Sequence, residues 1–494
     1  MLAGAAGNGG GEMAKSVCII GAGIGGLTAG ALLANAGFQV TVLEKASTVG
    51  GSAGFYIRKG RMFPTGATVA FGLEEGGLLR ELLNESGVQL PAECLSHPMD
   101  VILPDRKISI YQRTEYWEEE LQRVFFEHPE RVLRFWRELH KIGEMVQAVS
   151  ASGISLPIKK LYDLGSFARL ALRRPVSMLR LARYALSTVE DLLKKHKLEH
   201  YLPFRQFLDA QLLDAAQTDA SEAALLPSSL ALTIYRKGSF SIEKGLGQIS
   251  SSLSERIVEL GGRVELVSPV RKIEYSKSEN KWKAESRKCS GAFDLIINNS
   301  GISFGKGTSH SEGDEFSWGA FRVDSIVSGK DQKTLPFAYQ IMPQGEQEAF
   351  HGPIYATLQE SRDASGLTIE DEMILTISVH TDSKIWASFG KEEYRQRKEQ
   401  LTGRLLHEVD KITSIKTRLQ KAEAGTPLTY QKFVGKTEVG GFPLTVRNSV
   451  IKPKSFRTSL PGFYLAGEQV FPGPGTLSAA LSGRNAARAI IKEH

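Results

Sequence analysis

A short apolar run followed at once by closely spaced glycines constrains the fold of this chain more than any other feature. Residues 17–20 (VCII) precede residues 21–26 (GAGIGG), and a helical stretch then extends to residue 36. Residues 38–43 form a second apolar run, which ends at Glu44. Strand, glycine turn, helix, strand and acid in this order are typical of a βαβ dinucleotide-binding unit. The sequence therefore predicts an α/β fold with a parallel sheet.

The residue types in this unit have separate physical roles. Gly21 permits the tight turn, Gly23 lets the backbone approach a pyrophosphate, and Gly26 lets helix and strand pack closely. Gly25 belongs to the same predicted site, at a helix N-terminus whose free N–H groups favour phosphate. Glu44 accepts hydrogen bonds from ribose hydroxyls and disfavours a 2′-phosphate, so FAD or NAD is preferred over NADP.

A second glycine pair follows the acid within a few residues. Residues 44–52 (EKASTVGGS) resemble the extended fingerprint of the FAD-binding amine oxidase and carotenoid desaturase superfamily. The resemblance implies FAD as the cofactor, with Lys45, Gly50, Gly51 and Ser52 along its length. Taken without the resemblance, the glycine pair is an ordinary turn.

The C-terminal part of the chain carries an independent match to the same superfamily. A predicted strand ends at Gly467 and Glu468, a loop follows over residues 471–476 (FPGPGT), and a helix covers residues 477–490. The resemblance implies that this helix returns to the flavin, with Gly475, Thr476 and Leu477 nearest, and that its dipole favours negative charge on the ring. Glu468 is then expected to bind cofactor rather than to transfer protons.

Two further strands are predicted between the two ends of the chain, and the second of them covers residues 294–299 (DLIINN). A strand is predicted over residues 263–273, in which the backbone of Val270 clamps the adenine by resemblance; taken alone, Val270 is an ordinary strand residue. No second strand–GxGxxG–helix unit follows, so no tightly bound nicotinamide is indicated, and the electron acceptor stays open.

The carotenoid isomerase and phytoene desaturase branch resembles this chain in several segments. These are residues 51–55, residues 63–72 with the cofactor-binding Gly66, Ala67 and Thr68, and residues 426–430, 439–443 and 471–475. Ser52 departs from the Arg or Lys common in desaturases, which favours the isomerase and retinol-saturase side. Residues 482–487 (SGRNAA) also resemble the corresponding segment of amine oxidases.

The expected architecture is a Rossmann-like FAD-binding domain, with a parallel sheet and helices, plus an α+β substrate domain with a helical, membrane-facing part. The predicted boundaries are a disordered N-terminal extension (1–14), FAD-binding parts (15–98, 236–304 and 425–494) and substrate parts (99–235, helical, and 305–424). A purine-rich coding stretch for residues 9–12 suggests Met13 as the true start.

The basic region 156–200 carries ten Lys and Arg against four Asp and Glu, a net +6 that equals the formal charge of the whole chain. Met178, Leu181, Ala185, Val189 and Leu192 recur at helical spacing, with basic residues on another face. Such a helix either lies on an anionic membrane or packs between domains with a solvated basic face; both interpretations stay open. The region contains no nucleic-acid-binding motif.

The three cysteines, Cys18, Cys94 and Cys289, lie far apart without CxxC spacing. This predicts no disulfide and no metal site, and favours the cytoplasm, with peripheral contact on the inner face of a membrane. Cys18 is expected to be a buried strand residue.

These predictions together indicate an FAD-dependent oxidoreductase that acts on a lipophilic polyene (carotenoid, apocarotenoid or retinoid-like) by desaturation, saturation or cis–trans isomerisation. No catalytic side chain stands out, so the flavin is expected to carry the chemistry. The alternatives are a flavin amine oxidase that releases hydrogen peroxide and a flavin-bound membrane scaffold without turnover.

Overall fold

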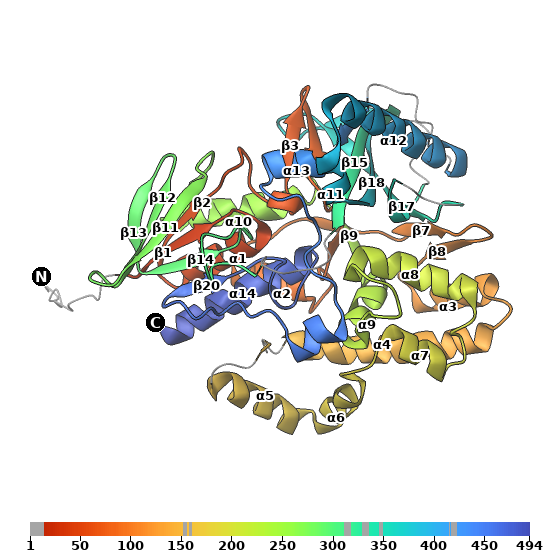
Figure 1. The fold of residues 1–494 in the computed structure, drawn as a ribbon. Coiled ribbons are helices and arrows are strands. Elements are labelled where there is room, and N and C mark those ends of the chain that lie inside the picture. Colours follow the sequence, from red (N-terminus) through yellow and green to blue (C-terminus); the bar gives the residue numbers. More distant parts are fainter. Residues whose placement is uncertain are drawn as a thin grey trace, which may run out of the picture.

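The computed structural model describes most of the chain, namely residues 14–151, 156–157, 161–310, 318–328, 335–344, 349–413, 415 and 422–494. The predicted N-terminal extension lies outside these residues except for Ala14, and so does Met13. Figure 1 shows a sheet with helices at the left of the view, a second sheet at the upper right and a group of helices below it.

The first sheet has five strands, all parallel. Their spatial order is β10 (Arg263–Glu265), β2 (Gln39–Leu43), β1 (Ser16–Ile20), β14 (Leu295–Asn298) and β20 (Phe463–Leu465). Its helices are α1 (Ile24–Asn35), α10 (Gly247–Glu259) and α14 (Thr476–Glu493). A three-stranded antiparallel meander packs against it through Trp282 and Phe463, whose rings lie 5.0 Å apart. Its strands are β11 (Val270–Ser276), β12 (Lys281–Ser286) and β13 (Ser290–Phe293).

The second sheet has seven strands and mixed direction. Its order is β19 (Glu423–Gly425), β15 (Trp318–Ser328), β18 (Thr368–Asp382), β17 (His351–Arg362), β16 (Ala338–Ile341), β7 (Met99–Ile102) and β8 (Lys107–Ile110). Helix α12 (Lys391–Ile412) packs its apolar residues against one face, because alternate strand residues such as Phe321, Val323 and Ile377 point to that side. The short helices α11 (Ser383–Ser388) and α13 (Pro427–Phe433) flank the sheet.

The helical part surrounds an aromatic core. Trp117, Phe125, Phe135, Phe204 and Phe207 are almost fully buried and pack on one another. The helices are α3 (Thr114–Val124), α4 (Pro129–Ala151), α5 (Leu161–Arg173), α6 (Pro175–Tyr184), α7 (Val189–Lys195), α8 (Leu202–Ala216) and α9 (Leu225–Thr233).

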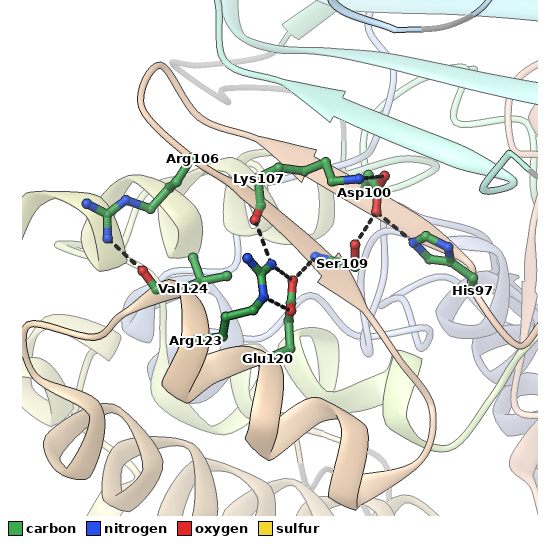
Figure 2. Close-up of polar contacts among 8 residues, drawn as sticks. All are labelled: His97, Asp100, Arg106, Lys107, Ser109, Glu120, Arg123 and Val124. Atoms are coloured by element: carbon green, nitrogen blue, oxygen red, sulfur yellow. Dashed lines mark hydrogen bonds and ion pairs between the residues drawn. The ribbon is translucent and has the colours of Figure 1, made fainter.

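Buried polar contacts join the β7–β8 hairpin to α3, as Figure 2 shows. Glu120 of α3 accepts a hydrogen bond from the backbone N–H of Ser109 at 2.7 Å and pairs with Arg123. Asp100 of β7 accepts hydrogen bonds from His97 and from the Ser109 hydroxyl. These contacts fix the hairpin on the helical part.

Shorter elements connect the large units. They are η1 (Gly51–Ala53), β3 (Phe55–Arg58), β4 (Arg61–Pro64), β5 (Ala70–Phe71), α2 (Leu78–Glu85), β6 (Ala92–Cys94), η2 (Ile234–Arg236), β9 (Ser239–Ile242) and η3 (Arg447–Ile451).

The parallel sheet with its helices and the second α+β unit confirm the predicted fold class. Cys18 is a buried strand residue, as predicted. The prediction of one strand over residues 263–273 is wrong: β10 ends at Glu265 and β11 begins at Val270, because Val267 takes a φ of +54° and Pro269 has no N–H to donate.

The prediction of one amphipathic helix through residues 178–192 is also wrong. Helix α6 ends at Tyr184, and α7 begins after Thr188, whose hydroxyl caps it by accepting from the Asp191 N–H. Leu181, Val189 and Leu192 are buried in the helical core, so this apolar face packs inward. Within the described ranges no helix combines the length and the apolar character needed to cross a bilayer.

Candidate functional site

The first glycine loop joins β1 to α1 and has the geometry that the sequence predicts. Gly21 has a φ of +95°, and its N–H donates to the Leu43 carbonyl at 2.9 Å. A Cβ on Gly26 would overlap the Gly21 carbonyl oxygen, so only glycine lets the helix approach the strand. Helix α1 begins at the Gly23 N-cap without a side-chain cap. Its first-turn N–H groups and dipole are therefore suited to an anion.

The second glycine pair lies directly beside the first loop. The N–H of Gly50 donates to the Ala22 carbonyl at 2.8 Å, and Gly23 and Gly50 form a parallel bridge. Gly50 and Gly51 both have positive φ, +107° and +56°, which a side chain would disfavour. The two glycine motifs thus form one continuous backbone wall.

Glu44 lies at the end of β2, next to this wall. Its carboxylate accepts hydrogen bonds from the N–H groups of Ala22 at 2.6 Å and Ala46 at 2.7 Å. The Ser268 N–H donates to the Glu44 carbonyl, which brings Val270, at the start of β11, into the same neighbourhood. Each carboxylate oxygen has two lone pairs, so the fixed carboxylate retains capacity for ribose hydroxyls.

The loop over residues 65–68 connects the glycine wall to the seven-stranded sheet. On the glycine side, the Ala67 N–H donates to the Ser52 carbonyl at 2.9 Å. On the sheet side, three side chains donate to its carbonyls: Tyr430 to Thr65 at 3.2 Å, Arg322 to Gly66 at 3.5 Å and Gln359 to Thr68 at 3.5 Å.

A buried ion pair supports that loop. Arg322 and Asp324 on β15 are each 4% exposed, and Arg322 Nη2 lies 2.7 Å from Asp324 Oδ1. Tyr56 donates to Asp324 at 2.8 Å, and burial together with that carboxylate raises the pKa of Tyr56. Sequence reasoning missed this group, because Tyr56 and the Gly66 carbonyl lie far from Arg322 and Asp324 in the chain.

Helix α14 brings the C-terminal segment to the first glycine loop. A Cβ on Gly483 would overlap the Gly25 carbonyl, so α1 and α14 touch through backbone. The N-cap, Gly475, has no side chain to cap the helix, and Thr476 and Leu477 in the first turn remain partly accessible. Leu477 Cδ2 lies 3.4 Å from the position of a Cβ on Gly72. The predicted cofactor residues from both ends of the chain are thus brought together.

Glu468 forms an ion pair with Lys436, a residue that the sequence analysis did not single out. Burial lowers the pKa of Lys436 to about 8, against the opposing effect of the Glu438 carboxylate. The Lys45 ammonium lies 3.7 Å from the position of a Cβ on Gly435, so a second cation borders this loop. Lys436 lies between residues 426–430 and 439–443, two segments that carry the family resemblance. That position could have marked Lys436 as a candidate site residue.

Asn299, directly after β14, is a second residue that sequence reasoning missed. Its Nδ2 donates to the Gly21 carbonyl at 3.1 Å, while its buried Oδ1 has no hydrogen-bond partner. A polar Asn298–Asn299 pair at the carboxyl end of a buried parallel strand was a usable signal, because ligands bind at that edge of such sheets.

Comparison with known proteins agrees with this geometry. The family model described as flavin containing amine oxidoreductase matches residues 24–299, more than half of the chain. The chloroplastic prolycopene isomerase of Arabidopsis thaliana is 26% identical over 96% of this chain and 82% of its own length. The 4,4′-diapophytoene desaturase of Methylomonas sp. is 27% identical over 52% of this chain and 48% of its own length.

The fold is also found among solved structures. A putrescine oxidase variant superposes with a TM-score of 0.62, covering 97% of this chain and 99% of that chain at 14% identity. At this identity the likeness concerns the fold alone.

Proposed function

The chain belongs to the flavin-containing amine oxidoreductase family, and on that premise we propose that this FAD-dependent oxidoreductase desaturates, saturates or isomerises a hydrophobic polyene. The observation that carries the proposal is the alignment of 96% of this chain with a prolycopene isomerase. The partial match to a diapophytoene desaturase supports the same class of substrate.

The residues present fit FAD. Helices α1 and α14 have no side-chain cap at their N-termini, so their first N–H groups are free to bind an anion. The buried Asn299 Oδ1 has no hydrogen-bond partner in the protein and can accept a hydrogen bond from a ligand. We assign the binding of FAD to Gly21, Gly23, Gly25, Gly26, Glu44, Lys45, Gly50, Gly51, Ser52, Gly66, Ala67, Thr68, Val270, Gly467, Glu468, Gly475, Thr476 and Leu477. When bound, FAD supplies hydride acceptance and donation.

The chain's own groups have supporting roles in this proposal. The α14 N-terminus favours negative charge on the cofactor, and the Lys436–Glu468 pair holds charge beside it. Arg322 and Tyr430 orient the 65–68 loop through its carbonyls, which makes them positioning residues.

The test uses the FAD-loaded protein with polyenes in liposomes. Poly-cis-lycopene and phytoene are offered separately, with oxidised flavin plus a quinone and with dithionite-reduced flavin. We expect at least one polyene, under one of the two flavin conditions, to change its chromatographic and absorption profile during the assay. An unchanged profile of every polyene, with flavin demonstrably bound, contradicts the proposal.

A matched pair of glycine variants tests whether the cofactor site carries that activity. Gly26→Ala introduces a Cβ that overlaps the Gly21 carbonyl, so we expect loss of bound flavin absorbance and of polyene conversion. Gly403→Ala on α12 meets no atom within 4 Å and is the control. Retention of flavin by Gly26→Ala at the level of Gly403→Ala contradicts the assignment.

The amine oxidase alternative is separated in the same preparation. Putrescine and benzylamine are added under air, and hydrogen peroxide is measured. Peroxide release together with unchanged polyenes would favour amine oxidation. Flavin that no polyene and no amine reduces would favour a scaffold without turnover.

We also propose that α5 and α6 contact an anionic membrane, from which a polyene is delivered. Figure 1 shows both helices at the lower edge of the view, outside the other helices. Leu172, Val176 and Leu179 are more than 60% exposed there, and the neighbouring Arg173 and Arg180 are exposed too. Exposed leucines flanked by arginines suit the headgroup region of an anionic bilayer.

A sedimentation assay with vesicles of mixed anionic and zwitterionic lipid tests the membrane contact. Leu172→Ser combined with Leu179→Ser should lower the bound fraction several-fold, roughly as expected from the lost apolar area. Leu367→Ser, at a residue 69% exposed in the turn between β17 and β18, is the control. Equal binding of both variants and the wild type would overturn the contact.

A further inference from the structure

The two faces of the seven-stranded sheet differ sharply in polarity. The face against α12 is apolar, whereas the opposite face carries Arg322, Asp324, Gln340, Thr357 and Thr376, all buried. These residues alternate with the apolar ones along β15, β16, β17 and β18. Arg322, Asp324 and Thr376 bond to one another, whereas Gln340 and Thr357 each keep a side-chain atom without a partner.

Helix α8 contacts the polar face, and buried side-chain atoms on the sheet and at the end of α8 have no partners. Gln211 of α8 donates to the side chain of Gln340 on β16, which places helix and sheet in contact. Gln340 Nε2, Thr357 Oγ1 and Gln217 Oε1 have no hydrogen-bond partner, although their residues are only 0%, 1% and 6% exposed. Buried polar atoms in native proteins almost always have a partner, from the protein, water or a ligand.

Asp214 lies on the same helix, three residues after Gln211. Burial raises the pKa of its carboxyl to about 6, and no cation among the described residues offsets this. Its side chain nevertheless stays accessible, so solvent or a ligand can reach the carboxyl.

Two tyrosines are affected by the Asp214 charge. Tyr355 on β17 is the cross-strand partner of Gln340, whose side chain accepts a hydrogen bond from Gln211, one turn before Asp214 on α8. Burial raises the pKa of Tyr235 and Tyr355 above the ordinary value, and the Asp214 charge raises both further. Tyr355 also contacts the side chain of Thr68, in the predicted cofactor loop. The three groups come from three separate elements, α8, η2 and β17.

This place lies close to the N-terminus of α14. The Tyr235 ring packs edge-on against Phe71, with centroids 4.9 Å apart, and the next residue, Gly72, contacts Leu477. One aromatic ring and one loop residue thus separate the Asp214 cluster from the helix end assigned to the flavin.

We propose that Asp214, Tyr235 and Tyr355 bind a hydroxyl group of the substrate, so that the preferred polyene is oxygenated rather than a hydrocarbon. This inference rests on the proposed function. A hydroxyl donates one hydrogen bond and accepts two. The Asp214 carboxylate and Gln217 Oε1 are suitable acceptors, and the tyrosine O–H groups and the Gln340 Nε2–H are suitable donors. An ammonium only donates and would leave Gln340 Nε2 unsatisfied.

The experiment titrates the FAD-loaded enzyme with matched ligands and follows the flavin spectrum. One pair is lycopene and its 1-hydroxy-1,2-dihydro derivative; the other is retinol and the hydrocarbon of the same skeleton. We expect the hydroxylated member of one pair to bind about 100-fold more tightly or better, because a site built for a hydroxyl rejects the analogue without it.

Variants separate a hydroxyl site from a merely structural cluster. Asp214→Leu and Tyr235→Phe should abolish or reduce the preference for the hydroxylated ligand while the hydrocarbon still binds. Asp219→Asn, at an exposed carboxylate after α8, is the control and should keep the wild-type preference.

The possible failures are distinguishable. If no polyene of either pair binds, the proposed function itself fails. If polyenes bind with no preference for the hydroxyl, or if Asp214→Leu keeps the preference, only the present inference is overturned. Tighter binding of retinylamine than of retinol, lost in Asp214→Leu, would overturn the hydroxyl in favour of an amine.

Discussion

Two carboxylates on the substrate side, Asp100 and Asp214, differ in the partners that surround them. Asp100 accepts hydrogen bonds from His97 at 2.6 Å, the Ser109 hydroxyl at 2.7 Å and Lys107 at 3.1 Å (Figure 2). Burial alone would raise the pKa of Asp100, but these donors hold it below the ordinary value. Asp214 stays accessible but lies among protein atoms without such donors, and desolvation raises its pKa to about 6.

This difference in partners separates polar groups that stabilise the fold from polar groups that have no partner in the protein and are available to a ligand. A carboxylate that has all its hydrogen-bond partners stabilises the unit that contains it. A desolvated carboxylate without partners destabilises the fold, and such residues are typical of functional sites. Asp324, paired with Arg322, belongs with Asp100. The difference can be tested residue by residue.

The largest effect is expected at Arg322. Arg322→Met leaves the Asp324 carboxylate buried and unpaired, so the free energy of unfolding should fall by about 4 kcal/mol. The double variant Arg322→Met, Asp324→Leu replaces both charges with apolar groups and should recover most of that loss. Urea unfolding of the FAD-loaded proteins measures both. A loss below about 1 kcal/mol in the single variant would show that the pair is solvated.

A smaller loss is expected at Asp100. Asp100→Leu leaves His97 and the Ser109 hydroxyl without their acceptor and should lower the free energy of unfolding by about 2–3 kcal/mol at pH 7. Because the folded pKa lies below the unfolded value of 3.8, the stabilisation is present above that value and is lost as pH falls through the folded pKa. The difference between wild type and variant should therefore shrink below about pH 4. Asp100→Asn, which keeps an acceptor, is the control.

Local features of the fold were predictable because they depend on neighbouring residues. The glycine loop at Gly21 and Gly26 follows from the spacing of the glycines and from the φ values that the turn requires. The start of α7 also depends on neighbouring residues, because Thr188 and Asp191 form a capping box. The sequence analysis missed this start because the apolar repeat continues through residues 178–192.

The polar groups of the site were not predictable, because their meaning depends on distant partners. Arg322 reaches a carbonyl 256 residues away, at Gly66, and Lys436 pairs with Glu468 across 32 residues. Asp100 and Asp214 look alike in the sequence, each an acid within an apolar stretch. Only the fold shows that one meets three donors and the other meets none of the described cations.

Removal of the Asp214 charge should stabilise the protein. The folded pKa is raised, so the ionised carboxylate costs stability increasingly as pH rises from 3.8 to about 6, and the full cost persists above that range. Asp214→Asn should therefore raise the free energy of unfolding at pH 7.5 by about 1 kcal/mol, less than the full shift because the group stays accessible. At pH 3.5 the two proteins should be equal. A loss of stability in Asp214→Asn at pH 7.5 would mean that the carboxylate has hydrogen-bond partners in the folded protein.

The smallest effect is expected at Arg123. This residue tests whether the loss of stability depends on how many hydrogen-bond partners a buried carboxylate keeps, rather than on how close the removed partner was. Arg123 is 63% exposed and pairs with the buried Glu120 at 2.7 Å, but Glu120 also accepts from the Ser109 N–H at 2.7 Å. Arg123→Ala should therefore cost about 0.5 kcal/mol in urea unfolding, and less at high salt. Glu120→Ala removes the acceptor of a buried N–H and should cost more. A loss at Arg123 as large as that at Glu120 would mean that the backbone hydrogen bond alone does not satisfy the carboxylate, and Asp100 and Glu120 would then depend on their charged partners.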